Sequence, residues 1–183
     1  MHRLFVAIDL PQAVKRELAG ICSGLPGARW VNDEQIHLTL RFIGEVDDGL
    51  FQDIREELAD IKSFAFTMRL AGLGFFPPRR QPHVLWAGVE PVDSIVLLRD
   101  RVESVLVRLG LEPEGRKFFP HVTLARLRDT PVAKVDRYLA ANMSFVSSEF
   151  RVDAFHLYSS VLTSDRAIHQ VESTCSLILP SRN

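Results

Sequence analysis

The chain has few cysteines, no long hydrophobic run and almost no net charge, and each of these absences excludes a class of protein. Its two cysteines, Cys22 and Cys175, form no Cys-x-x-Cys or zinc-type pattern, so we expect reduced, packed thiols. No run of about 18 apolar residues predicts a membrane span. The apolar run at residues 4–8 ends at Asp9 and is too short for a signal peptide. We therefore expect a cytoplasmic protein without membrane contact.

The charge balance limits how the protein can bind nucleic acid. The 183 residues carry a formal net charge of −1, with 46% hydrophobic and 25% charged residues, which is ordinary for a globular protein. Without an excess of basic residues, a chain does not bind long nucleic acid by charge alone. Any nucleic-acid substrate should be held locally, at an end or at a few phosphates.

One short pattern does occur, and it occurs twice. His37-Leu-Thr39-Leu lies within residues 35–44, and His121-Val-Thr123-Leu lies within residues 118–126. Both copies sit in apolar runs that favour β-strands, and nearly half the chain separates them. This spacing predicts two related halves, each bringing one copy to a shared centre.

Strand geometry gives the pattern a chemical meaning. Side chains alternate between the two faces of a strand, so His37, Thr39 and Arg41 should share one face. A histidine exchanges protons near neutral pH, and a threonine hydroxyl can donate to an oxyanion. Two facing His/Thr pairs would supply an acid, a base and two anion-binding hydroxyls, as displacement at a phosphate requires. Arg126 has the wrong parity to share the face of His121, and either a bulge or the strand end re-aims it, or its side chain reaches round.

Hydrophobic periodicity and turn residues predict an α+β fold. We expect strands over residues 4–8, 29–31, 35–44, 64–70, 84–89, 118–127, 150–158 and 168–179, and helices over residues 11–23, 47–61, 93–109 and 131–141. This order predicts one two-lobed domain over residues 1–183, built from internally duplicated β-α-β-α-β units with pseudo-repeat halves at about 1–83 and 84–183. Antiparallel sheets should meet around a central cleft, with the helices outside.

The paired motif resembles the two-histidine phosphoesterases, and the flanking sequence resembles one branch of them, the RNA 2',3'-cyclic phosphodiesterases (LigT-like or 2'-5' RNA ligase-like proteins). The similar stretches are Arg3-Leu-Phe-Val-Ala-Ile, Trp30-Val, residues 37–46, Gly74-Phe-Phe-Pro, Val84-Leu-Trp86-Ala-Gly88 and residues 119–126. The chain departs from the family after Leu162, where a Gly-Pro pair and a tyrosine usually follow. Residues 163–168 contain no glycine, and His169 stands in the tyrosine position, so a substrate contact from this loop is not carried over.

The resemblance implies metal-independent, cofactor-free hydrolysis of 2',3'-cyclic phosphate ends of RNA or nucleotides to 2'-phosphates, with weak reversible 2'-5' RNA ligase activity. It implies that His37 is the proton donor and His121 the proton acceptor, and that Thr39, Thr123 and Arg126 bind the substrate phosphate. Candidate RNA contacts are Arg41, Phe42, His83, Phe119 and Ser160. Core packing remains the favoured interpretation for Phe5 and Phe42, and we expect a monomer.

Three alternatives stay open at this point. A related phosphoesterase acting on 2'-5' oligonucleotides or small cyclic nucleotide phosphates would share the motifs, and only a substrate panel would separate it. A non-catalytic module that binds RNA ends is disfavoured because both motifs are intact. A metal hydrolase using His37, His83 and His121 is disfavoured because no Asp/Glu-x-His or His-x-His spacing accompanies them.

Overall fold

The computed structural model describes residues 1–162 and 167–180; the predicted departure from the family at residues 163–166 lies outside this part of the chain. The helices are α1 (Gln12–Ala19), α2 (Asp48–Ala59), α3 (Asp93–Arg108) and α4 (Val132–Ala141), with a 3₁₀ turn η1 (Asp33–Gln35). The strands are β1 (His2–Asp9), β2 (Ala28–Trp30), β3 (His37–Val46), β4 (Phe66–Phe76), β5 (Val84–Glu90), β6 (His121–Leu127), β7 (Phe150–Val152), β8 (Ala154–Leu162) and β9 (Ala167–Ser176).

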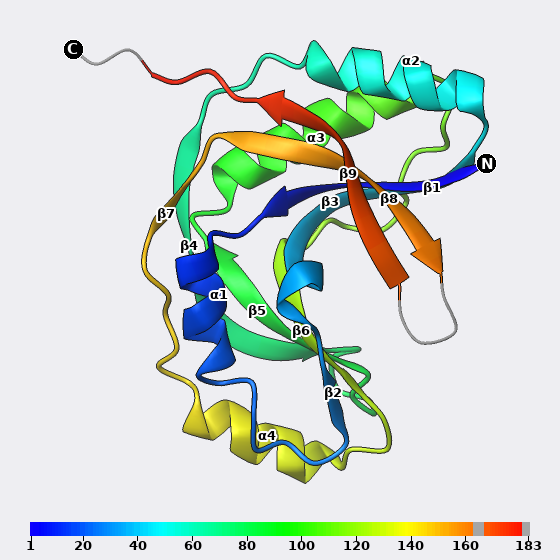
Figure 1. Cartoon of the computed structure of the whole chain (residues 1–183). Coiled ribbons are helices and arrows are strands. Elements are labelled where there is room, and N and C mark those ends of the chain that lie inside the picture. The colour runs from blue at the N-terminus through cyan, green and yellow to red at the C-terminus, as the bar shows by residue number, and fades with distance from the viewer. Residues whose placement is uncertain (163–166, 181–183) are drawn as a thin grey trace.

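The strands form one curled sheet in the order β7-β4-β5-β6-β3-β1-β8-β9, with β2 added beside β6. All pairs of named strands are antiparallel, so the predicted α+β class with antiparallel pairing is confirmed. The two expected sheets are continuous, because β3 and β6 join them through the pair Leu38–Val122. Figure 1 shows α2 and α3 together at one end of the molecule and α4 at the other.

Local sequence signals explain some element boundaries and miss others. Asp47 caps α2, because its carboxylate accepts a hydrogen bond from the Leu50 N–H at 2.9 Å. The helix α1 ends at Ala19 rather than at the predicted Ser23, with Gly20 as its C-cap residue. The cap of α3 is Val92, not Asp93 or Ser94, and β4 runs on to Phe76 into the predicted loop. The predicted β4–β5 hairpin is confirmed.

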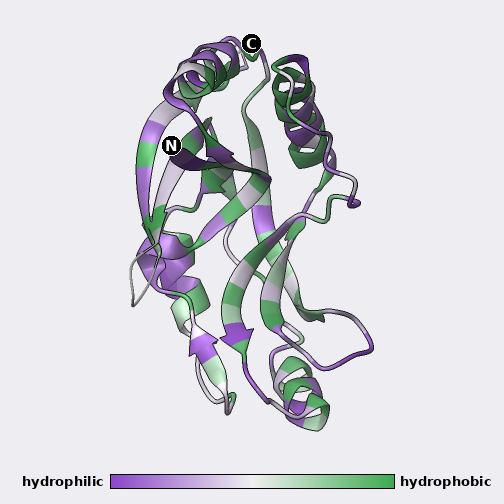
Figure 2. Cartoon of the chain, turned by 90° about the vertical axis from the view of Figure 1, so that its right-hand side faces the viewer, coloured by the Kyte–Doolittle hydropathy of each residue, from purple (hydrophilic) through white to green (hydrophobic). Residues whose placement is uncertain are grey.

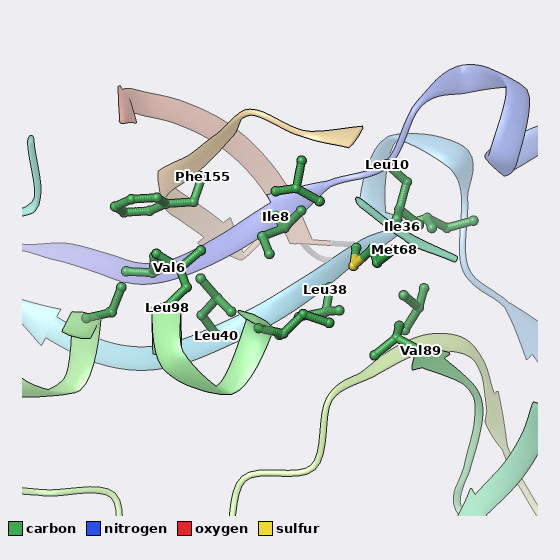
Figure 3. Packing of buried hydrophobic residues seen from close by; sticks show 14 of the residues in the cluster. Val6, Ile8, Leu10, Ile36, Leu38, Leu40, Met68, Val89, Leu98 and Phe155 are labelled. Carbon is green, nitrogen blue, oxygen red and sulfur yellow. The ribbon is translucent and has the colours of Figure 1, made fainter. Parts of the chain in front are cut away.

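The main core lies between the sheet and the helices. Alternate residues of β1 and β3 point into it, as shown for Val6, Ile8, Leu38 and Leu40 in Figure 3. The other face of the sheet carries both motif histidines, and we call it the site face. In Figure 2 the helices carry both hydrophobic and hydrophilic residues, as expected when only one side of each helix packs on the core.

The structure also bears on the two cysteines and on the search for membrane-spanning helices. Cys22 and Cys175 are both free, as predicted, and burial raises the pKa of Cys22 to about 11. None of the helices within residues 1–162 and 167–180 is long and apolar enough to cross a membrane.

The two motif strands pair with their outer neighbours in the same register. In β1–β3 the opposed residues are Asp9–His37, Ala7–Thr39 and Phe5–Phe42, and in β5–β6 they are Gly88–His121, Trp86–Thr123 and Val84–Arg126. Each strand also bulges at the same place, since Leu40 and Leu124 are the extra residues that follow the motif threonines. This correspondence supports the proposal that residues 1–83 and 84–183 are duplicated halves of one domain.

Candidate active site

The two His/Thr motifs lie side by side at the centre of the sheet. Leu38 of β3 opposes Val122 of β6 in antiparallel register, which sets His37 beside Thr123 and Thr39 beside His121. Leu38 and Val122 are fully buried in the core, so their four neighbours point to the site face. The side chains that the sequence predicts to meet are therefore brought together, one pair from each half.

Both histidine rings are held by a main-chain carbonyl two residues upstream. Nδ1 of His121 lies 2.7 Å from the carbonyl oxygen of Phe119, and the ring of His37 is hydrogen-bonded to the backbone of Gln35. A carbonyl oxygen only accepts hydrogen bonds, so the ring nitrogen that faces it carries the proton. The remaining nitrogen of each ring is left to exchange a proton with a ligand.

The environment of His37 is closed by three rings. The ring centroids of Phe5, His169 and Tyr158 lie 4.9, 5.6 and 6.1 Å from that of His37. The first residue of β9 approaches η1, where Gln35 Nε2 donates to the Ala167 carbonyl at 2.5 Å. Burial, and then the nearby charge of His169, lower the pKa of His37 from 6.5 to about 4, against the opposing effect of Asp9.

The environment of His121 is built from different aromatic residues. The ring centroids of Phe76 and Phe119 lie 5.0 and 6.3 Å from that of His121, and both rings contact Trp86. The indole lies on Gly74, where a Cβ would come within 2.2 Å of the Trp86 ring, so any other residue here would have to displace the indole. Burial lowers the pKa of His121, and the hydrogen bond to Phe119 opposes that shift.

The two bulges decide which residue follows each motif on the site face. After the bulge at Leu124, Arg126 is exposed and opposes Val84. A bulge is therefore what re-aims Arg126 to the face of His121. After the bulge at Leu40, Phe42 opposes Phe5 and is 60% exposed. Phe5 is packed, at 3% exposure, but Phe42 is not, so the expected core packing of Phe42 is wrong.

The prediction that Arg41 shares the face of His37 is also wrong, for the same reason. The bulge turns Arg41 to the helix side of the sheet, where its Nε donates to Glu103 of α3 at 2.6 Å. Its guanidinium also donates to the main-chain carbonyls of Phe42 and Glu112. With its side chain only 11% exposed, Arg41 joins the sheet to α3, on the side away from the motif histidines.

The other candidate RNA contacts are spread around the centre. Phe119 is 48% exposed and borders His121. Ser160 of β8 is half-buried and opposes His169 of β9. His83 is exposed in the loop between β4 and β5, and its main chain bonds Phe76 and Leu127.

Sequence reasoning did not assign four of the aromatic residues beside the histidines. Phe76, Trp86 and Tyr158 line the site face, together with His169, whose Nδ1 is buried without a hydrogen-bond partner in the described part of the chain. Strand parity would have found Tyr158, because it opposes Phe5. The Gly-Phe-Phe-Pro stretch that contains Phe76 was a second available signal.

A metal site does not form from the histidines that sequence reasoning considered. Within residues 1–162 and 167–180, no group of three or more His, Cys, Asp or Glu side chains is arranged to hold a metal ion. His37, His83 and His121 therefore do not assemble as a ligand set.

Comparison with known proteins finds relatives of this chain in both sequence and fold. A family model described as LigT like Phosphoesterase matches residues 8–86 and 89–169. An RNA 2',3'-cyclic phosphodiesterase of Thermotoga maritima is 36% identical over 183 residues, covering 94% of this chain and 94% of that protein. Another, from Aeropyrum pernix, is 37% identical over 150 residues, covering 81% and 85%. The crystal structure of E. coli LigT complexed with 3'-AMP matches with a TM-score of 0.78 at 27% identity, covering 96% and 98%.

Proposed function

Because this chain belongs to the LigT-like phosphoesterase family, we propose that His37 and His121 catalyse the hydrolysis of RNA 2',3'-cyclic phosphate ends. The chain is an enzyme of the phosphodiesterase class, since its curated relatives are RNA 2',3'-cyclic phosphodiesterases. The observation that carries the residue assignment is the central register, which sets each motif histidine beside the threonine of the other motif.

The reaction needs one proton acceptor and one proton donor at the phosphorus. In the proposed direction, neutral His121 takes a proton from water, and the oxygen of that water attacks phosphorus in line with the 3' oxygen. The bond from phosphorus to the 3' oxygen breaks, and protonated His37 donates its proton to that oxygen. The product carries a 2'-phosphate and a free 3'-hydroxyl, and the reaction balances with no oxidant or metal.

Thr39, Thr123 and Arg126 stabilise the phosphate as negative charge develops on its non-bridging oxygens. Their positions favour this role, because each motif threonine lies beside the histidine of the other motif and Arg126 lies beyond the bulge on the same face. Donors fixed before the reaction need no rearrangement in the transition state, which is why such groups contribute strongly to rate.

The electrostatics of the free protein favour neutral histidines. Burial lowers the pKa of His37 to about 4 and also lowers the pKa of His121. A bound phosphate anion has the opposite effect, since a nearby negative charge favours the protonated ring. We infer that His37 takes up its catalytic proton together with the substrate.

The proposal also covers the RNA contacts, the ligase activity, the oligomeric state and the cellular location of the protein. Phe42 and Phe119 offer exposed rings on which a base can stack, and Ser160 and His83 are further candidate contacts. With a 5'-hydroxyl in place of water as the nucleophile, the same groups would join a cyclic phosphate end to that hydroxyl and release the 3' oxygen, giving weak, reversible 2'-5' ligation. Because one chain supplies both motifs, we propose that it acts as a monomer, and we place it in the cytoplasm.

A substrate panel tests the function. We expect turnover of nucleoside 2',3'-cyclic phosphates and of oligoribonucleotides with a 2',3'-cyclic end, and weaker action on 2'-5'-linked oligonucleotides or other small cyclic nucleotide phosphates. Binding of RNA ends without turnover of any of these would instead support a non-catalytic module.

A further inference from the structure

The two motif histidines differ in the residue that lies opposite them on the outer neighbouring strand. Asp9 of β1 opposes His37, whereas Gly88 of β5 opposes His121. Directly opposed residues of an antiparallel pair point to the same side of the sheet, with Cβ atoms about 4.5–5.5 Å apart. The duplicated register therefore places a carboxylate beside one histidine and a residue without a side chain beside the other.

The packing of β1 places the Asp9 carboxylate on the site face. Val6 and Ile8 are buried in the main core, and alternation along the strand turns Ala7 and Asp9 to the opposite face. Ala7 packs there in a separate cluster that includes Tyr158 of β8. Asp9 is the last residue of β1 and is exposed. Its carboxylate is therefore on the same face as the neighbouring motif histidine.

Two hydrogen-bond donors hold the Asp9 carboxylate in this place. Its Oδ1 accepts a hydrogen bond from the main-chain N–H of Leu10 at 2.9 Å. The Nζ of Lys15 in α1 lies 3.1 Å from the same oxygen, and the Lys15 side chain is only 10% exposed. A carboxylate that is fixed before a ligand binds needs no rearrangement when charge develops beside it.

The other charges around His37 do not cancel the effect of Asp9. Burial and then the charge of His169 on β9 are the larger influences, and both lower the pKa of His37. Asp9 raises this pKa, and by more than Lys15 lowers it. For His121, burial lowers the pKa and the opposing influence is a main-chain carbonyl. A carboxylate therefore favours the protonated ring of one histidine, and an uncharged group has that role at the other.

Two further titratable groups face this region from β8. Burial raises the pKa of Tyr158 to about 12, so its ring is neutral near pH 7. Burial lowers the pKa of His156, and Asp9 opposes that shift, so this ring is also mainly neutral near pH 7. Asp9 and Lys15 therefore supply the charges that act on His37 from β1 and α1.

We propose that Asp9 is a positioning residue for the proton donor: its carboxylate stabilises protonated His37 and so keeps a proton available for the leaving 3' oxygen. This inference rests on the proposed function for the direction of proton transfer. Asp9 takes no part in the transfer itself and acts through His37. The equivalent position in the other half, Gly88, brings no counter-charge to His121, which suits a proton acceptor.

The dependence of activity on pH separates this role from a structural one. The free protein that reacts holds a proton on His37 while His121 is neutral. A lower pKa of His37 makes this form rarer, by a factor of about ten for each unit. Below the acid limb of the profile both rings are protonated, and activity there depends on loss of the proton from His121. An effect that acts through His37 therefore disappears at low pH.

An NMR titration of the histidine rings and the pH profile of kcat/KM on a nucleoside 2',3'-cyclic phosphate test the proposal together. The proteins are wild type, Asp9→Asn, Asp9→Glu and, as a control for the lost charge, Asp53→Asn, which alters an exposed residue of α2. Because Asp9→Asn leaves the buried Lys15 without this ion pair, the double variant Asp9→Asn/Lys15→Met is included. The urea midpoint of each variant checks folding.

Asp9→Asn should lower the pKa of His37 by about half a unit, as expected for one partly screened charge at this distance, and leave that of His121 unchanged. The value of kcat/KM should then fall about threefold above about pH 5, and the difference from wild type should shrink toward about pH 4. Asp9→Glu should restore most of both quantities, and Asp53→Asn should change neither. The double variant should shift His37 in the same direction by less, since Lys15 partly offsets Asp9.

An unchanged pKa of His37 in folded Asp9→Asn would overturn the proposal. A lowered pKa with unchanged kcat/KM would also overturn it, because His37 would then not be the proton donor. A loss of kcat/KM at every pH that Asp9→Glu does not restore would show that Asp9 has only a structural role. Failure of the proposed function would appear separately, as no turnover of cyclic phosphates by the wild-type protein, whatever the NMR titration shows.

Discussion

The two motif strands share a backbone plan but differ in their surroundings. β3 and β6 have the same register, the same bulge after the threonine and the same carbonyl behind the histidine ring. Around His37 lie Phe5, Tyr158 and His169, whereas around His121 lie Phe76 and Phe119. The repeated backbone places two equivalent histidines, and their unequal neighbours lower the two pKa values to different extents.

The bulges extend this comparison to the substrate. The same one-residue insertion brings Phe42 to the site face in one half and Arg126 in the other. One half therefore offers an aromatic surface beside the centre, and the other offers positive charge. Under the proposed function, this difference suits a substrate that has a base on one side of the centre and a phosphate on the other.

Removing either histidine should have the largest effect. We expect His37→Ala and His121→Ala each to lower kcat about 10²–10⁴-fold on a nucleoside 2',3'-cyclic phosphate. The double variant should lose much less than the product of the two single losses, because the residues act as a unit. The control is His2→Ala, since His2 stacks on Phe51 and bonds Asp48 at the far end of β1. Loss of activity in only one of the two histidine variants would contradict the proposal that both histidines take part in the reaction.

Substitutions of the two residues that follow the bulges, Arg126 and Phe42, should change different kinetic parameters. Arg126→Gln should lower kcat about 10²-fold, because it removes a donor to the developing charge. Phe42→Ala should mainly raise KM, by about tenfold, because it removes one stacking surface worth about 1–3 kcal/mol. Steady-state kinetics on two cyclic nucleotides with different bases would check both, and equal effects on kcat would contradict the contrast.

The two threonines should be nearly equivalent. Thr39→Ala and Thr123→Ala each remove one hydrogen bond to a charged group, which is worth about 1.5–3 kcal/mol. This corresponds to a loss of about ten- to a hundredfold in kcat/KM, while the serine variants should keep most of the activity. If one alanine variant retained wild-type kcat/KM, only one motif would be contacting the phosphate.

The smallest effect is expected from a change in the surroundings of only one histidine, at His169 beside His37. One histidine must be protonated and one neutral, so kcat/KM should be bell-shaped in pH. Both pKa values are lowered, that of His37 to about 4, so the maximum should lie below pH 6.5. A pair that must hold one proton has its acid limb at the lower of its two pKa values, whichever residue is the donor, so this limb should lie near pH 4. His169→Phe removes the charge that lowers the pKa of His37, and the acid limb should move to higher pH by less than about one unit. His156→Phe is the matched control, and a limb that is unmoved in His169→Phe would contradict this cause.

The sequence was sufficient to predict the features of the fold and the site that follow from the alternation of side chains along a strand. It was insufficient for the features that depend on β-bulges and on contacts between distant parts of the chain. The paired motif, the parity of His37, Thr39, His121 and Thr123, and the antiparallel α+β class all follow from alternation of side chains. Bulges leave no signal in alternation, so Arg41 was assigned to the wrong face and Arg126 was left undecided. The approach of β9 to η1 joins residues far apart in the chain, so the burial of His37 beside His169 was not visible.

The most direct test of the central claim identifies the product of wild-type turnover in excess chelator. A nucleoside 2',3'-cyclic phosphate is incubated with the protein, and the phosphate isomers are resolved by ³¹P NMR. The account predicts full activity in chelator and a nucleoside 2'-phosphate as the only product. A 3'-phosphate product, or activity that returns only when a divalent metal is added back, would contradict the two-histidine mechanism.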